Sequence, residues 1–173
     1  MNDLKVIVAP DIRLNQISKS INYIEKNISI VLDKMLECMY KNNGIGLAAP
    51  QVGILKRLIV IDCSNNKENK RPLKLINPEI ISFSDELADY EEGCLSLPAQ
   101  FAKVTRPNKI KLRYRNSKGD KIEKNFIGLE ATCIQHEVDH LNGKLFVDHI
   151  SKLRKNIIIK KLIKYKKKIN THG

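Results

Sequence analysis

Residues 133–146 read CIQHEVDHLNGKLF, and the middle of this stretch holds two histidines four positions apart, His136 and His140, with Glu137 after the first. On a helix these histidines lie about one turn apart, roughly 6 Å along the axis, so both imidazoles project from one face toward a single metal ion. Glu137 is placed to act as a general base toward a water on that ion without binding the ion itself. An apolar flank accompanies the pattern: Ile134, Val138 and Leu141. We therefore predict a packed, metal-binding helix at the centre of the fold.

Two histidines do not make a catalytic metal site, so a third ligand has to lie elsewhere. A metzincin would place a third histidine at position 146, where this chain has Phe146, and no glutamate follows Glu137. The remaining downstream candidates are Asp148, His149 and His172. The first two lie just past the end of the helix, so the chain would have to fold straight back. Upstream, Cys94 in the segment EEGCLSLP (91–98) is the better candidate, because three protein ligands and one water are typical of a catalytic metal.

A glycine-rich segment, GIGLAAPQ at residues 44–51, also fits the dinucleotide-binding pattern GxGxxA. That pattern requires a strand before it and a helix after it. Here a helical pattern precedes the segment and Pro50 follows closely, so we reject a dinucleotide site. A tight turn remains, in which small residues let the backbone of a ligand approach. Gln51 adds a neutral amide donor that is suited to an oxyanion.

The order of the other elements predicts an α+β fold, because the strands are grouped between helices and do not alternate with them. We expect short mixed or antiparallel strands packed around the central metal-binding helix, with a further helix at the C-terminus. The expected helices are 25–40, 129–142 with Gly143 as its stop, and 152–168; the expected strands are 57–63, 73–76, 79–83, 109–115 and 121–127, the last two forming a hairpin. Between 73–76 and 79–83 we expect Pro78 to interrupt pairing.

Length and composition favour one domain without a membrane span. A chain of about 150 residues buries enough surface for a single core, and this chain has 173 residues. It shows neither a signal-peptide pattern nor the roughly 20 apolar residues that cross a bilayer, so we expect a soluble, cytoplasmic protein. The four cysteines are spread singly, which favours free thiols over disulfides.

Three segments together, GIGLAAPQ (44–51), EGCLS (92–96) and QHEVDH (135–140), resemble in order and spacing the three motifs of the peptide deformylase family. The likeness runs from about residue 6 to residue 150. The resemblance implies an α+β fold and a metal-dependent hydrolase that removes the formyl group from the formylmethionine of new polypeptides and releases formate. We accordingly expect residues 1–150 to form a deformylase-like catalytic domain, with 151–173 as a basic C-terminal helix of the same domain.

The resemblance also implies roles for individual residues. Cys94, His136 and His140 would hold one divalent metal ion, commonly Fe²⁺ in this family, with Zn²⁺, Ni²⁺ or Co²⁺ as alternatives. Glu137 would be the general acid and base, and the oxyanion donors would be the Gln51 side chain and the Leu95 backbone NH. The residues implied to bind substrate are Gly44, Ile45, Gly46 and Gly93, which would pair with the peptide backbone, and Leu129 and Cys133, which would line a methionine pocket. Phe101 stands where some relatives have arginine, which argues against a polar contact to the peptide there.

The C-terminal stretch 151–173 holds nine Lys or Arg and no acidic residue, so it supplies most of the net charge of +12 of the whole chain. Tails of this kind commonly bind polyanions. In bacterial relatives a C-terminal helix helps dock the enzyme on the ribosome, so we predict that this tail binds ribosomal RNA. Its expected apolar face is Leu153, Ile157, Ile158, Leu162 and Ile169.

Two other functions are compatible with parts of the sequence. A peptidase or another amidase would use the same metal and general base, but its usual third ligands are missing. A catalytically silent RNA- or ribosome-binding protein would explain the basic tail, but it would have no use for Glu137 and Gln51.

Overall fold

The computed structural model describes residues 3–64 and 68–171. Its elements, in chain order, are η1 (Ile12–Asn15), α1 (Lys26–Lys41), β1 (Gly46–Ala48), η2 (Ala49–Val52), β2 (Leu58–Ile61), β3 (Leu73–Phe83), β4 (Leu87–Cys94), β5 (Leu97–Pro107), β6 (Lys109–Arg115), β7 (Lys121–Ile127), α2 (Gly128–Leu141), η3 (Phe146–His149) and α3 (Lys152–Thr171).

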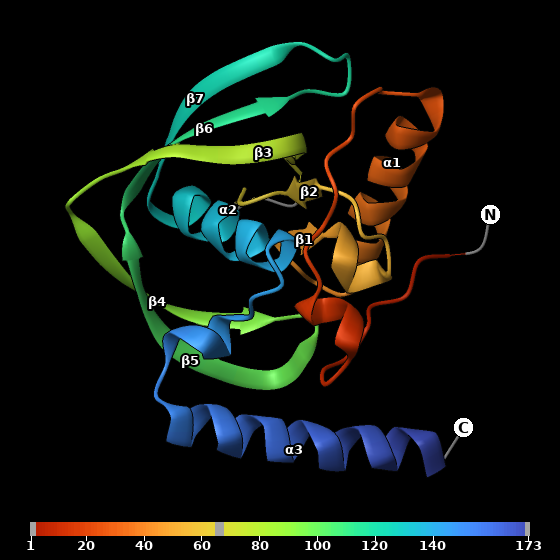
Figure 1. Ribbon diagram of the computed structural model, residues 1–173, viewed down its shortest axis with the longest axis vertical. Helices are drawn as coiled ribbons and strands as arrows, with labels where there is room; N and C mark the ends of the chain where they lie inside the picture. The colour runs from red at the N-terminus through yellow and green to blue at the C-terminus, as the bar shows by residue number, and fades with distance from the viewer. Residues whose placement is uncertain (1–2, 65–67, 172–173) are drawn as a thin grey trace.

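The strands form two sheets, and α2 lies between them. One sheet has five strands in the order β1-β2-β3-β6-β7, and β4 pairs with β5 in a separate two-stranded sheet. All strand pairings within the described ranges are antiparallel. Figure 1 shows α2 enclosed between the larger sheet and the β4–β5 hairpin, with α1 at the β1–β2 end of the molecule. The expected α+β fold with strands around a central helix is thus confirmed.

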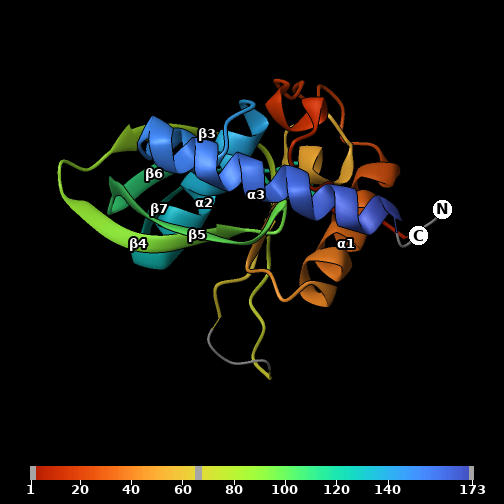
Figure 2. The same cartoon turned by 90° about the horizontal axis from the view of Figure 1, so that it is seen from below.

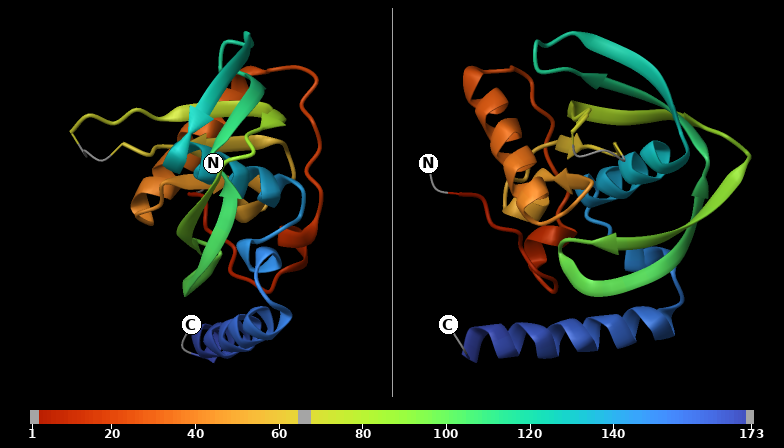
Figure 3. Two further views of the ribbon diagram at one scale, coloured as in Figure 1. Left: turned by 90° about the vertical axis from the view of Figure 1, so that its left-hand side faces the viewer. Right: turned by 180° about the vertical axis from the view of Figure 1, so that it is seen from behind.

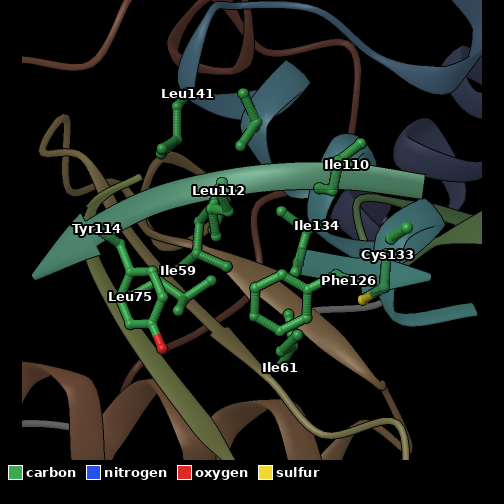
Figure 4. Packing of buried hydrophobic residues seen from close by; sticks show 13 residues of the cluster. Ile59, Ile61, Leu75, Ile110, Leu112, Tyr114, Phe126, Cys133, Ile134 and Leu141 are labelled. Carbon is green, nitrogen blue, oxygen red and sulfur yellow. The ribbon is translucent and has the colours of Figure 1, made fainter. Parts of the chain in front are cut away.

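Strand β2 explains how the sheet can hold both α1 and α2. Neighbouring side chains of a strand point to opposite faces of the sheet. All four residues of β2 are buried, because both faces are covered here. Ile59 and Ile61 pack into the cluster that contains Ile134 of α2, whereas Leu58 and Val60 pack into the cluster around α1. The first of these clusters is drawn in Figure 4, where Ile134 lies among the side chains of the sheet. The short apolar run RLIVIDC therefore forms a buried strand, shorter by three residues than expected.

Most of the other predicted boundaries agree with the structure, but α3 continues three residues beyond its predicted end at 168, and one strand prediction was wrong. The expected hairpin has the predicted bounds in β6 and β7, and α1 and α2 begin and end within one residue of their predicted positions. Residues 73–83, however, form one strand rather than two. Pro78 is accommodated because β3 has register shifts between Ile76 and Glu79 and between Ile80 and Ser82, so the proline falls where no ladder bond is needed.

Helix α3 lies outside the layered core, beneath the β4–β5 hairpin (Figure 2). Its buried side chains, Ile158 and Leu162, join a cluster with residues of β5 and η3. The other three residues of the expected apolar face, Leu153, Ile157 and Ile169, are 72%, 46% and 48% exposed, so they are not buried with Ile158 and Leu162. The helix is also tied to the N-terminal segment, because Lys166 Nζ donates to the carbonyls of Val8 and Pro10. Figure 3 shows this helix below the other elements, both from the side and from behind.

Within the described part of the chain, none of the helices has the length and apolar character that crossing a membrane requires.

Candidate metal centre and active site

The metal-ligand candidates of the sequence meet at one point. Cys94 ends β4, and His136 and His140 lie one turn apart on α2; their ligand atoms are all within 4.8 Å of one another. Cys94 Sγ is 3.2 Å from His140 Nε2, and the two Nε2 atoms are 3.3 Å apart. In a tetrahedral site with ligands about 2.0–2.3 Å from the ion, neighbouring ligand atoms are roughly 3.3–3.7 Å apart. The three donors therefore fit a divalent metal in both chemistry and spacing.

Two of the three downstream alternatives, Asp148 and His149, do not reach this point. Asp148 accepts a bond from the Leu145 backbone NH and pairs with Lys155. His149 Nε2 lies 2.7 Å from Asp139 Oδ2 and is absent from the ligand cluster formed by the described residues. His172 falls outside the residues that the structure describes.

Two glycines with positive φ angles, Gly128 and Gly143, flank α2 and fix where it begins and ends. Gly128 has a φ of +63°, which lets β7 turn directly into the helix. At the other end, Gly143 has a φ of +72°, and a Cβ there would lie 2.5 Å from the carbonyl oxygen of Asn15. The predicted stop at Gly143 is thus confirmed, and it also lets the N-terminal segment pack against the end of the helix.

A network of buried charges orients the first histidine. His136 Nδ1 lies 2.9 Å from Glu92 Oε2, and Arg106 donates to both oxygens of Glu92 at 2.6 and 3.1 Å. Arg106 also bonds Asp139, one residue before His140, at 2.8 Å. Burial would raise the pKa of Glu92, but the bonds from His136 and Arg106 outweigh it and lower that pKa. An ionised Glu92 can only accept, so His136 carries its proton on Nδ1 and leaves Nε2 free for a metal.

Glu137 is buried beside the cluster. Its Oε2 has no hydrogen-bond partner among the described residues, so this oxygen is available to a ligand. Burial raises the pKa of Glu137 to about 7, which suits a group that both accepts and releases a proton near neutrality. Gly46 makes room for it, because a Cβ at position 46 would lie 2.4 Å from Glu137 Oε1.

Gln51 is also buried, and its amide is held in one orientation. Its Oε1 accepts a bond of 2.8 Å from the Ala48 backbone NH. Its Nε2 therefore faces the other way, 3.4 Å from Cys94 Sγ and 3.3 Å from Ser96 Oγ. The amide donor is thus directed toward the ligand cluster, as an oxyanion donor needs to be.

A cleft of about 520 Å³ leads to these groups. It is lined by all the residues that the sequence implied for substrate binding, namely Gly44, Ile45, Gly46, Gly93, Leu129 and Cys133, and also by Leu95, Gln51 and Glu137. A side chain at position 93 would collide with Phe101 on the paired strand, because a Cβ there would lie 2.6 Å from the Phe101 ring. Phe101 itself is 60% exposed at the wall of the cleft.

Sequence reasoning missed Glu92 and Arg106 as site residues. For Glu92 a signal existed, because it stands two positions before Cys94 on a strand and so points to the same side. Arg106 gave no signal, since it lies at the far end of the next strand in the sequence.

A Cys-His-His cluster with two buried histidines, beside a protonatable carboxylate at the foot of a cleft, defines the class of metal-dependent hydrolases. The family model described as polypeptide deformylase matches residues 3–156. The peptide deformylase of Bartonella henselae is 47% identical over 166 residues, which cover 96% of this chain and 94% of that protein. The peptide deformylase of Agrobacterium fabrum is 47% identical over 161 residues, which cover 92% of this chain and 94% of that one.

Solved structures with a similar fold are also peptide deformylases. A peptide deformylase from Legionella pneumophila superposes with a TM-score of 0.88 at 38% identity, and the match covers 96% of each chain. The enzyme from Ehrlichia chaffeensis, in complex with actinonin, gives a TM-score of 0.88 at 36% identity over 95% of this chain and 98% of that one. This chain therefore belongs to the peptide deformylase family. It is a metal-dependent hydrolase that removes the N-formyl group from newly made polypeptides, which decides against the peptidase and against the silent binding protein.

Proposed function

We propose that Cys94, His136 and His140 bind the catalytic ion and that Fe²⁺ is the native metal. The observation that carries the proposal is the convergence of the three ligand atoms beside the unpartnered Oε2 of Glu137. Zn²⁺, Ni²⁺ and Co²⁺ suit the same mixture of thiolate and imidazole, so the choice of Fe²⁺ rests on the resemblance to the family. When bound, the ion supplies a Lewis acid that polarises the formyl carbonyl and makes a water molecule more acidic.

The reaction adds water to the formyl carbon and breaks its bond to the methionine nitrogen. Glu137 takes the proton of the attacking water and passes it to the departing amine, which leaves formate and a free N-terminus. The Gln51 amide and the Leu95 backbone NH donate to the oxyanion of the tetrahedral intermediate. Gln51 is already oriented for this by its bond from Ala48, so no reorganisation is required.

The peptide substrate binds as an added strand in our proposal. Strand β1 lies at the edge of the larger sheet, so its outer side is available for pairing along Gly44, Ile45 and Gly46. Gly93 on β4 also lines the cleft and supplies backbone groups for the peptide. Leu129 and Cys133, which project from α2 into the cleft, line the pocket for the methionine side chain.

The proposed roles are tested by following formate release from a formyl-Met peptide without oxygen, with the acetyl-Met peptide as control. We expect formate from the first substrate and neither formate nor peptide cleavage from the second. Metal analysis of protein purified without oxygen should find about one Fe²⁺ per chain. Cleavage of the peptide bond without formate would contradict the proposal.

We further propose that the C-terminal helix docks this enzyme on ribosomal RNA in the cytoplasm, where new chains emerge, and that it belongs to the same domain as residues 1–150. The packing of Ile158 and Leu162 against β5 and η3 supports a single domain. Lysines on the outer side are exposed, among them Lys160, Lys161 and Lys164. Exposed apolar residues, Leu153 and Ile157, lie on the same helix and offer additional contact area.

The test compares two triple charge reversals that change the net charge equally. Reversal of Lys160, Lys161 and Lys164 to Glu should lower ribosome co-sedimentation strongly and reduce its dependence on salt. The matched control reverses Lys109, Lys118 and Lys121, which are exposed at the β6–β7 hairpin. Equal losses in both variants would point to net charge alone and would rule out a specific role for α3.

A further inference from the structure

Two of the four cysteines come together behind the substrate cleft. Cys63 follows β2, whose residues Ile59 and Ile61 face α2; alternation along the extended chain places Cys63 on that same face. Cys133 projects from α2 into the same cluster, beside Phe126 (Figure 4). All four cysteines are free thiols.

Gly46 brings the helix unusually close to the sheet at this place. It pairs with Ile61, and a Cβ on Gly46 would lie only 2.8 Å from Cys133 Sγ. The missing side chain therefore lets the Cys133 thiol reach the strand backbone, where it donates to the Ile45 carbonyl at 3.6 Å. Asp62, the neighbour of Cys63, donates its backbone NH to that same carbonyl at 2.8 Å. The Ile45 carbonyl thus holds the Cys133 thiol and the backbone next to Cys63, and Cys63 packs against the cluster that contains Cys133.

The segment that carries Cys63 is anchored on both sides. The Asp62 carboxylate accepts bonds from the Tyr40 hydroxyl at 2.6 Å and from the Ser64 backbone NH at 3.0 Å. Cys63 is half-buried, whereas Cys133 is buried. The hydrogen bond to Cys63, followed by burial, raises the pKa of the Cys133 thiol well above its ordinary value.

We propose that Cys63 and Cys133 are an oxidation site, at which a peroxide joins the two sulfurs in a reversible disulfide that deforms the substrate cleft. The more accessible Cys63 reacts first. Its thiolate attacks a peroxide oxygen and the O–O bond breaks, which leaves a sulfenic acid on Cys63 and releases hydroxide. The proton that the Cys63 thiol had lost converts this hydroxide into water. Cys133 then attacks that sulfur, the S–O bond breaks, and the thiol proton leaves with the hydroxide as a second water. Peroxide is reduced to two waters, and the two thiols are oxidised.

The effect on activity rests on the role of Cys133 proposed above. A disulfide brings the two sulfurs to about 2.05 Å and leaves Cys133 without the S–H that donates to the Ile45 carbonyl. Cys133 thereby loses its bond to Ile45, and the part of the cleft wall that it contributes changes. We expect KM for a formyl-Met peptide to rise about tenfold, which corresponds to about 1.4 kcal/mol of lost binding, and dithiothreitol to reverse the change.

The test uses the full chain loaded with Zn²⁺, which has no redox chemistry of its own and occupies the Cys94 thiolate. After treatment with hydrogen peroxide, mass spectrometry of the non-reduced protein should find a loss of two hydrogen atoms and a peptide linking Cys63 to Cys133. Cys63→Ser should not form the link and should keep its KM. The matched control, Cys38→Ser, changes a thiol on α1 on the other face of the sheet and should behave like the unaltered protein.

Two results would overturn the proposal: both thiols still open to alkylation after unfolding of the oxidised protein, or reversible inhibition that persists in Cys63→Ser. A link that forms without any change in KM would refute the effect on the cleft. The mass readout does not depend on catalysis, so a failure of formate release in the reduced protein would count against the proposed function and not against the oxidation site.

Discussion

Helices α2 and α3 are both amphipathic in sequence, but they occupy opposite environments. Of the 14 residues of α2, ten are buried, and they include His136, Glu137 and His140. Helix α3 has 20 residues, and within its described side chains Ile158 and Leu162 are the buried ones. Polar groups on α2 are therefore forced to find partners or ligands, whereas those on α3 remain available to solvent or to another molecule. Burial, rather than helical pattern, therefore distinguishes the helix that carries the metal-ligand candidates from the C-terminal helix.

The largest effect is expected at the buried carboxylate of α2. Glu137→Gln keeps the shape of the side chain but removes the group that moves the proton, so kcat should fall by about 10²–10⁴-fold. Metal content should stay unchanged, because Glu137 is adjacent to the ligand cluster and not part of it. Cys94→Ala, in contrast, should lose the metal. Steady-state kinetics and metal analysis of both variants check this prediction, and full metal retention in Cys94→Ala would refute the proposed ligand set.

The buried ion network around α2 is expected to matter more than an exposed ion pair near α3. Arg106→Met leaves the buried Glu92 and the half-buried Asp139 without their shared partner, which should lower the free energy of unfolding by about 3–5 kcal/mol. Metal affinity should fall by about 10–100-fold, because His136 loses its supported orientation.

The matched variant for that network is Lys155→Met, which breaks the partly exposed pair with Asp148. Its cost should be below about 1 kcal/mol, with metal affinity unchanged. Urea denaturation and metal titration measure both quantities. Similar losses of stability and of metal affinity in the two variants would contradict the expected difference between the two helices.

Apolar truncations give a second, smaller contrast. Ile134→Ala on α2 opens a cavity in a fully buried site and should cost about 2–5 kcal/mol. Ile157→Ala on α3 removes a side chain that is 46% exposed and should change the free energy of unfolding by less than about 0.5 kcal/mol. Thermal and urea unfolding provide the measurement. A large cost at Ile157 would mean that α3 packs more tightly than its exposure indicates.

The smallest effect is expected where the N-terminal segment meets α3. The hydrogen bond from Arg13 lowers the pKa of Asp11 to about 2, and Lys166 of α3 lies 3.9 Å from the same carboxylate. A pKa below the ordinary 3.8 means that the ionised form stabilises the fold. This contribution is present above about pH 4 and is lost as the pH falls toward 2.

Because solvent screens this site, Asp11→Asn should lower stability at neutral pH by less than about 1 kcal/mol and should remove that part of the acid sensitivity. Unfolding curves of the variant and the unaltered protein, recorded between pH 7 and pH 2, should converge at the acid end. Curves that stay parallel would show that Asp11 contributes nothing through its charge.

Much of the fold and most of the candidate site were predictable where the signal is local. The hairpin of β6 and β7 is encoded by alternation within 109–115 and 121–127, and α2 by its apolar flank and by Gly143. The β4–β5 hairpin was not predicted, since its strands carry polar residues on their exposed sides and give no clear apolar run. The exposure of Leu153 was also missed, because helical spacing says which residues share a face but not how much of that face is covered.

Three features can be read from the sequence alone: the three motifs, the spacing of His136 and His140, and the basic character of the C-terminal helix. The contact of Arg106 with Glu92, and the packing of Cys63 against the cluster that contains Cys133, follow only from the folded chain. Each of these pairs joins residues of different elements. The physical reason is that backbone periodicity is written in neighbouring residues, whereas contacts between elements depend on how closely the whole chain packs, here on the room that Gly46 leaves beside α2.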